Sequence, residues 1–186
     1  LNIRVGNTVY AKENDSYGLT TLKKKHVKLS NNNEVVFVFK GKSGVKHTLV
    51  CHIRNFIDFM GELGELEGTK LFQYKNNSGD IREIHSTDMN EYLTENMGDF
   101  TCKDFRTYSA NRLLLDYLRS GSVNDKKLLK HSLEKTAEKL GHTYSMTKKS
   151  YVLPCVIDTW KQSSEVIRNG DNVDKILLEI VSKELK

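Results

Sequence analysis

The periodicity of apolar residues changes along the chain, and this change restricts the possible folds. Between residues 18 and 52, stretches rich in β-branched and aromatic residues alternate with Asn- and Gly-rich turns. Such stretches predict strands, and turns this short join neighbouring strands in an antiparallel meander. The expected strands are Gly18–Leu29, Glu34–Lys40 and Val45–His52, with turns at Asn31–Asn33 and Gly41–Gly44.

After residue 55 the apolar residues recur at spacings of three and four, which is typical of amphipathic helices. Residues 1–14 carry no cap signal and are expected to form the tail of a helix plus a loop, and Leu71–Tyr74 a short extended piece. The expected helices are Phe56–Leu63, a helix from Ser86 or Thr87 to Met97, Thr101–Arg119, Lys126–Leu140 capped by Asn124, a helix capped by Thr147, and Val173–Leu185. The fold class is therefore α+β, mostly α-helical, with one small three-stranded antiparallel sheet.

The composition is that of a soluble globular domain. The chain has 186 residues, 38% hydrophobic and 28% charged, with no apolar run or leader pattern that predicts a membrane span or signal peptide. Three widely spaced cysteines indicate free thiols in a reducing compartment. The net charge of +5 favours polyanionic partners. The length fits one domain, 1–186. Because residue 1 is Leu, we expect this domain to be a fragment of a longer protein.

The segment Leu140–Tyr151 is the richest in chemistry. Gly141 is a helix stop signal, and Thr147 is expected to cap a helix that carries Tyr151 in its second turn. This arrangement would hold His142 near Tyr151, with Lys148 and Lys149 between them. Positive side chains around a phenol suit a tyrosine that meets phosphate. A core histidine, a half-buried tyrosine and a solvated lysine pair would leave the same pattern.

Lys42 stands in a tight turn between Gly41 and Gly44. Glycines allow close approach of the backbone to a ligand, although an ordinary exposed turn lysine fits equally well. Gly41–Ser43 also matches the end of a phosphate-binding loop, but that motif requires glycine at the position of Val36. Nucleotide binding is rejected on this ground.

The helix expected to start after Thr101 carries Lys103 and Arg106 on one face near its positive end, with Asn111 on the neighbouring face. Cations at this end interact unfavourably with the positive end of the helix dipole, and a bound anion would offset this repulsion. A solvated basic face remains the alternative.

Two other kinds of site are excluded. A zinc site at His47, Cys51 and His52 fails because alternation along a strand places His52 on the opposite face from the other two. A serine hydrolase site is excluded because the sequence contains no nucleophile-elbow motif. No metal ligands or cofactors are expected.

The chain combines six candidate site residues: Arg4, Lys42, Lys103, Arg106, His142 and Tyr151. With these residues the sequence resembles the catalytic domain of type IB DNA topoisomerases of the short poxvirus and bacterial kind. The similarity covers nearly all of the chain up to about Trp160, in family order. The motifs that carry it are Ile3–Asn7, Tyr17–Leu22, Phe39–Lys42, Leu71–Tyr74, Lys103–Tyr108 and Leu140–Thr143 followed by Tyr151.

The resemblance implies the fold of a DNA breaking-rejoining enzyme and an ATP- and metal-independent isomerase that relaxes supercoils. Tyr151 would attack one strand of double-stranded DNA and form a 3′-phosphotyrosine. Arg4, Arg106 and His142 would bind the non-bridging oxygens, and Lys42 would protonate the leaving 5′-oxygen. It also implies that Lys103, Asn111, Lys148 and Lys149 support DNA binding. The protein would be monomeric, bind no nucleotide or membrane, and work inside cells or virions with DNA.

The sequence departs from the family pattern at several points. Ser43 follows the turn lysine where the family often has an acidic residue, and His142 replaces the Asn of many bacterial members. We also expect that this fragment lacks the family's N-terminal domain and the start of the catalytic domain. A tyrosine recombinase is the nearest alternative, but recombinases typically carry His at the position of Lys103. A non-catalytic basic DNA-binding module is a further alternative, which would have no need of a nucleophile.

Overall fold

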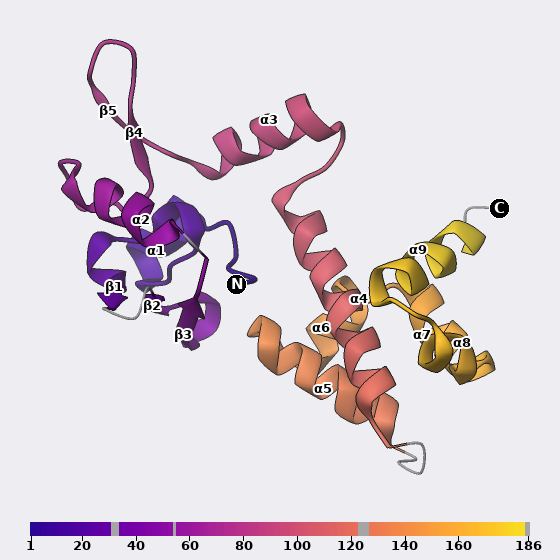
Figure 1. Cartoon of the computed structure of the whole chain (residues 1–186). Helices are drawn as coiled ribbons and strands as arrows, with labels where there is room; N and C mark the ends of the chain where they lie inside the picture. The colour runs from indigo at the N-terminus through magenta and orange to yellow at the C-terminus, as the bar shows by residue number, and fades with distance from the viewer. Residues whose placement is uncertain (31–33, 54, 123–126, 185–186) are drawn as a thin grey trace. The chain divides into compact units, whose positions relative to one another are not determined.

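The computed structural model describes residues 1–30, 34–53, 55–122 and 127–184 (Figure 1). These residues form two compact units. Unit 1 comprises Leu1 and Ile3–Cys102, and unit 2 comprises Asn2 and Lys103–Lys186. That the two belong to a single domain stays a prediction.

The expected meander is confirmed in unit 1. Its strands are β1 (Val27–Ser30), β2 (Glu34–Lys40) and β3 (Lys46–Cys51), all antiparallel in the order β1-β2-β3. The expected turn at Asn31–Asn33 lies outside the described residues.

The first strand starts later than predicted, at Val27 rather than Gly18. The intervening chain forms two 3₁₀ turns, η1 (Leu19–Thr21) and η2 (Lys24–His26). The Thr21 hydroxyl accepts a hydrogen bond from the Gly18 amide at 2.9 Å and donates one to the Gly18 carbonyl at 3.0 Å. Such local bonds from a side chain to the backbone compete with strand pairing.

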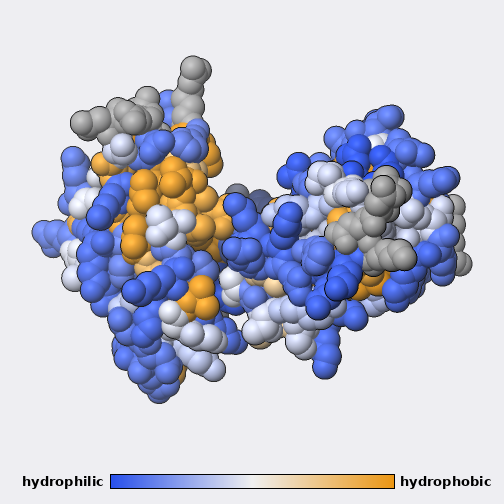
Figure 2. Space-filling model, turned by 90° about the horizontal axis from the view of Figure 1, so that it is seen from below, coloured by the Kyte–Doolittle hydropathy of each residue, from blue (hydrophilic) through white to orange (hydrophobic). Residues whose placement is uncertain are grey.

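Alternation along β2 places Val35, Phe37 and Phe39 in the core of unit 1, all at most 7% exposed. Helix α2 (Phe56–Glu65) contributes Met60 and Leu63 to the same core, as its spacing predicts. On the opposite face of the sheet Val38 and Val50 are each 43% exposed. Figure 2 shows apolar side chains gathered over one side of this unit, at left.

Unit 1 also contains elements that the sequence reading missed or misplaced. Helix α1 (Thr8–Asn14) has its own cap, because the Asn7 side chain accepts from the Tyr10 amide at 3.1 Å. A second antiparallel sheet pairs β4 (Gln73–Lys75) with β5 (Ile81–Glu83). Helix α3 (Ser86–Met97) is capped at His85, one residue before the predicted cap.

Unit 2 is helical. Its helices are α4 (Cys102–Ser120), α5 (Leu128–Leu140), α6 (Tyr144–Ser150), α7 (Pro154–Gln162), α8 (Ser164–Asn169) and α9 (Val173–Glu184). The predicted stripe on α5 faces the core, where Leu133 and Leu140 are 1% and 2% exposed. The expected cap Asn124 lies outside the described residues.

Among the described residues, no helix is both long and apolar enough to cross a membrane.

Acidification should destabilise unit 1 through His26. This ring is 8% exposed, packs edge-on against Tyr17 and accepts the Lys23 amide at Nδ1 at 3.1 Å. Burial lowers the pKa of His26, and the charges of Lys25 and Lys23 lower it further. A depressed folded pKa means that the stabilisation is complete above the unfolded pKa of about 6.5 and is lost as the pH falls through the folded value.

Urea unfolding measured between about pH 7 and pH 5 should therefore show a falling free energy of unfolding. His26→Asn keeps an acceptor for the Lys23 amide but cannot titrate, so its curve should be flatter. Identical slopes for the two proteins would contradict this role for His26.

Candidate active site

Tyr151 lies at the end of a short helix rather than inside one. Helix α5 stops at Gly141, with φ 62° and ψ 45°, as the sequence predicted. The Thr143 hydroxyl then caps α6 by accepting the Met146 amide at 3.2 Å. The predicted cap at Thr147 is therefore wrong, because Thr143, four residues earlier, already caps the helix and Thr147 is buried within it.

The backbone after α6 is tightly held. The Thr147 carbonyl accepts the amides of both Tyr151 and Val152, at 3.2 and 3.0 Å. Tyr151 is the C-cap residue of α6, and a new helix begins at Pro154. The tyrosine thus sits at a break between two helices, where its side chain is half-buried.

Arg106, His142 and Tyr151 form a contiguous cluster in unit 2. Arg106 is 6% exposed, and its Nη2 donates to the Leu140 carbonyl at 3.0 Å and lies 2.7 Å from His142 Nε2. The His142 and Tyr151 ring centroids are 4.3 Å apart, and the Arg106 guanidinium carbon is 5.8 Å from the Tyr151 ring. The prediction that His142 lies near Tyr151 is confirmed, and Arg106 joins them.

The Arg106 contact also fixes the histidine tautomer. A guanidinium can only donate hydrogen bonds, so His142 Nε2 is the acceptor in this arrangement. The tautomer that fits this contact carries its proton on Nδ1.

Asn111 holds the backbone around the tyrosine. Its side chain is 0% exposed, and Nδ2 donates to the carbonyls of Thr107 and Tyr151 at 2.8 and 2.9 Å. Its Oδ1 accepts the Leu153 amide at 2.9 Å. The amide of Asn111 is thus engaged within the protein in this structure, and its expected support of DNA binding stays a prediction. Because Asn111 spans the helix break, it positions Tyr151.

The other expected supporting residues are exposed. Lys103 lies in the first turn of α4, and Lys148 and Lys149 lie in the last turn of α6. Their part in DNA binding stays a prediction.

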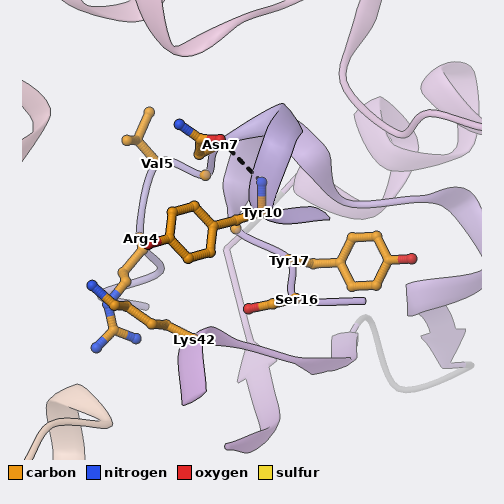
Figure 3. A pocket seen from close by; sticks show the side chains of 9 residues that line it. Arg4, Val5, Asn7, Tyr10, Ser16, Tyr17 and Lys42 are labelled. Atoms are coloured by element: carbon orange, nitrogen blue, oxygen red, sulfur yellow. Dashed lines mark hydrogen bonds between the residues drawn. The ribbon is translucent and has the colours of Figure 1, made fainter. Parts of the chain in front are cut away.

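In unit 1, Arg4 and Lys42 line one pocket of about 230 Å³ (Figure 3). Arg4 precedes α1, whereas Lys42 opens the 3₁₀ turn η3 (Lys42–Gly44) between β2 and β3. This turn requires left-handed backbone, with φ 61° at Ser43 and 78° at Gly44. Figure 3 shows both cationic side chains extending into the same region. Converging cations repel each other, and an anion between them would relieve the repulsion.

Sequence reasoning missed the aromatic wall of this pocket. Tyr10 and Tyr17 both line it, together with Asn7. Recognising Asn7 as a helix cap would have placed Tyr10 in the first turn of α1, next to Arg4. No comparable signal marks Tyr17.

Within the described ranges, no group of three or more His, Cys, Asp or Glu side chains could hold a metal ion.

Comparison with known proteins identifies the class. Residues 1–170 match the family model described as "Eukaryotic DNA topoisomerase I, catalytic core". The chain is 38% identical to DNA topoisomerase 1B of Acanthamoeba polyphaga mimivirus over 192 aligned residues, which cover 95% of this chain and 57% of that protein. It is 30% identical to DNA topoisomerase I of Monkeypox virus, over 97% of this chain and 53% of that protein. A Drosophila melanogaster DNA topoisomerase 1 is 29% identical over 71% of this chain and 14% of its own length.

The chain therefore belongs to the type IB DNA topoisomerase family, and within it to the short viral kind. It spans about half the length of the viral relatives it matches. The α+β fold, mostly helical with a small three-stranded antiparallel sheet, is the one the sequence predicted.

Replacing Asn111 tests whether its buried hydrogen bonds to the backbone of Tyr151 and Leu153 stabilise the fold. Asn111→Ala would leave the Tyr151 carbonyl and the Leu153 amide without this partner. We expect the free energy of unfolding, measured in urea, to fall by about 2–4 kcal/mol.

Ser120→Ala is the matched control, because it removes a bond from an exposed side chain to the backbone in the same helix, from Ser120 Oγ to the Asp116 carbonyl at 2.9 Å. Its cost should stay within about 0.5 kcal/mol. Equal effects of the two changes would rule out a special role for Asn111.

Proposed function

We propose that this chain breaks and rejoins one strand of duplex DNA as a type IB topoisomerase, with Tyr151 as nucleophile. The observation that carries the proposal is the packing of Tyr151 against the Arg106–His142 pair, with contacts of 4.3 Å to the imidazole centroid and 5.8 Å to the guanidinium carbon. Two phosphate-binding groups beside a phenol fit attack on a phosphodiester. The names of the relatives, all DNA topoisomerases, support the same reaction.

In the forward step, Tyr151 Oη loses its proton to water as it attacks phosphorus, and the bond from phosphorus to the 5′-oxygen breaks. The products are a 3′-phosphotyrosine and a strand that ends in a 5′-hydroxyl. Arg106 and His142 hydrogen-bond the non-bridging oxygens as negative charge builds there, and Arg4 does the same from unit 1. A guanidinium suits this role because its donors match two phosphate oxygens at once.

Lys42 is the proposed general acid. Its exposed position on a hairpin turn suits a group that transfers a proton to the leaving 5′-oxygen. The phosphotyrosine conserves the energy of the broken bond. Religation therefore needs no ATP: the 5′-hydroxyl attacks the phosphotyrosine and returns its proton to Lys42, and Tyr151 leaves and regains a proton from water. Between the two steps the free end can turn and release supercoils.

We further propose that the two units act together on one phosphodiester as parts of one catalytic domain. The net charge of +5 and the exposed Lys103, Lys148 and Lys149 support binding to the DNA backbone. Such a protein would work in a compartment that holds DNA, and the reaction itself needs only one copy of each catalytic side chain.

The covalent adduct is the direct test. Mixing the chain with supercoiled plasmid and then denaturing it should give a protein–DNA adduct on a gel. Tyr151→Phe should abolish the adduct while binding to DNA stays within about twofold, because only the nucleophilic oxygen is lost.

Tyr144→Phe is the control, since Tyr144 is an exposed tyrosine in α6 of the same segment. This variant should form the adduct normally. An adduct that persisted in Tyr151→Phe would refute the assignment of the nucleophile.

Lys42 can be tested through the leaving group. Lys42→Ala should slow cleavage by roughly 10²–10⁴-fold on ordinary DNA. A duplex with sulfur at the 5′-bridging position of a mapped cleavage site has a better leaving group and should recover most of that rate.

Lys46→Ala, which removes another exposed lysine from the same hairpin, should cleave both duplexes at the wild-type rate. An equal defect of Lys42→Ala on oxygen and sulfur substrates would exclude general acid catalysis by Lys42.

A further inference from the structure

Arg4 and Lys42 lie on separate irregular segments of unit 1, yet both line one pocket. Neither residue belongs to an α-helix or a strand, since Arg4 precedes α1 and Lys42 stands in the short 3₁₀ turn η3. The backbone of residues 17–20 contacts both segments. We propose that Gly18 and Thr20 are positioning residues, which fix the backbone of Arg4 relative to the hairpin that carries Lys42. This inference rests on the proposed function.

The contacts on the Arg4 side are direct. The Leu19 amide donates to the Arg4 carbonyl at 2.7 Å. Thr20 donates twice to the Val5 carbonyl, from its amide at 2.8 Å and from its hydroxyl at 2.9 Å. Thr20 is 5% exposed, so water does not compete well for these bonds.

Gly18 allows the two segments to touch. A Cβ at this position would lie 2.6 Å from the Arg4 carbonyl oxygen and 2.6 Å from Gly6 Cα. The backbone of Gly18 is extended, with φ −139° and ψ −177°, a conformation that any residue can adopt. Glycine is therefore required by space and not by conformation. Any side chain would push the Arg4 segment away.

On the Lys42 side, the Tyr17 amide donates to the Lys40 carbonyl at 2.8 Å, two residues before Lys42. The Gly41 amide then closes the hairpin by donating to the Val45 carbonyl at 2.7 Å. Tyr17 is 8% exposed and packs edge-on against His26 at 4.4 Å. A buried, packed residue therefore anchors the base of the Lys42 turn next to Gly18.

The proposed chemistry requires this register. Arg4 is to bind a non-bridging oxygen of the phosphate whose bridging oxygen Lys42 protonates. The distance between the two groups must then match the size of one phosphate. Displacement of either group by about 1 Å can lower the rate roughly 100-fold.

The test compares single-turnover cleavage of duplex DNA by four variants. Gly18→Ala should slow cleavage by roughly 100-fold, and Thr20→Val, which loses only the hydroxyl bond, by roughly tenfold. Thr20→Ser keeps the hydroxyl and should recover most of that loss. Gly61→Ala is the control, because no atom lies within 4 Å of its added Cβ, and it should cleave like the wild type.

A double-variant cycle separates positioning from general damage to the fold. If Gly18 acts through Arg4, Gly18→Ala should cost less than about twofold once Arg4→Ala is present. A full additional loss in the double variant would overturn the proposal, as would wild-type cleavage by Gly18→Ala. Should circular dichroism show that Gly18→Ala is unfolded, the Thr20→Val and Thr20→Ser pair decides, and equal rates for those two variants would overturn the proposal.

The controls keep this inference separate from the proposed function. If neither the wild type nor Gly61→Ala forms an adduct, the proposed function fails. If both form it and the Gly18 and Thr20 variants do so at the same rate, only the positioning role fails.

Discussion

The buried guanidinium of Arg106 organises unit 2. A charged group at 6% exposure is stable only if its donors are satisfied. The Arg106 guanidinium contacts the Leu140 carbonyl at the end of α5, His142 in the loop that follows, and the Asn2 carbonyl. The guanidinium that we expect to bind phosphate is therefore also the one that ties helix α4 to the approach to Tyr151. Its loss would disturb both structure and chemistry.

The tyrosine is placed mainly by backbone contacts. Thr147 and Asn111 between them engage the backbone of residues 151–153, and both side chains are fully buried. The break between α6 and α7 leaves the phenol half-buried beside Arg106 and His142. Buried hydrogen bonds to the backbone on both sides of Tyr151 therefore fix the position from which its side chain extends.

In unit 1, segments far apart in the sequence are joined by close approach of their backbones and not by a buried charge. Gly18 lies against Gly6 and the Arg4 carbonyl, and the sheet that supports this contact buries Phe37 and Phe39 on one face. The cations Arg4 and Lys42 then extend from irregular segments into a pocket. An anion between these two cations would relieve their mutual repulsion.

The sequence by itself determined strands β2 and β3, the helical character of the second half of the chain and the helix end at Gly141. These follow from local rules: alternation along β2, a stripe at helical spacing on α5, and the freedom of glycine to adopt positive φ. The tertiary structure decided what local rules could not. Either Thr143 or Thr147 could have capped α6, and packing buried Thr147. Asn111 could have faced solvent, but its amide lies beside the break after Tyr151, 40 residues further along the chain. Gly18 shows no local need for glycine, because its φ suits any residue, and only the approach of the Arg4 segment excludes a Cβ.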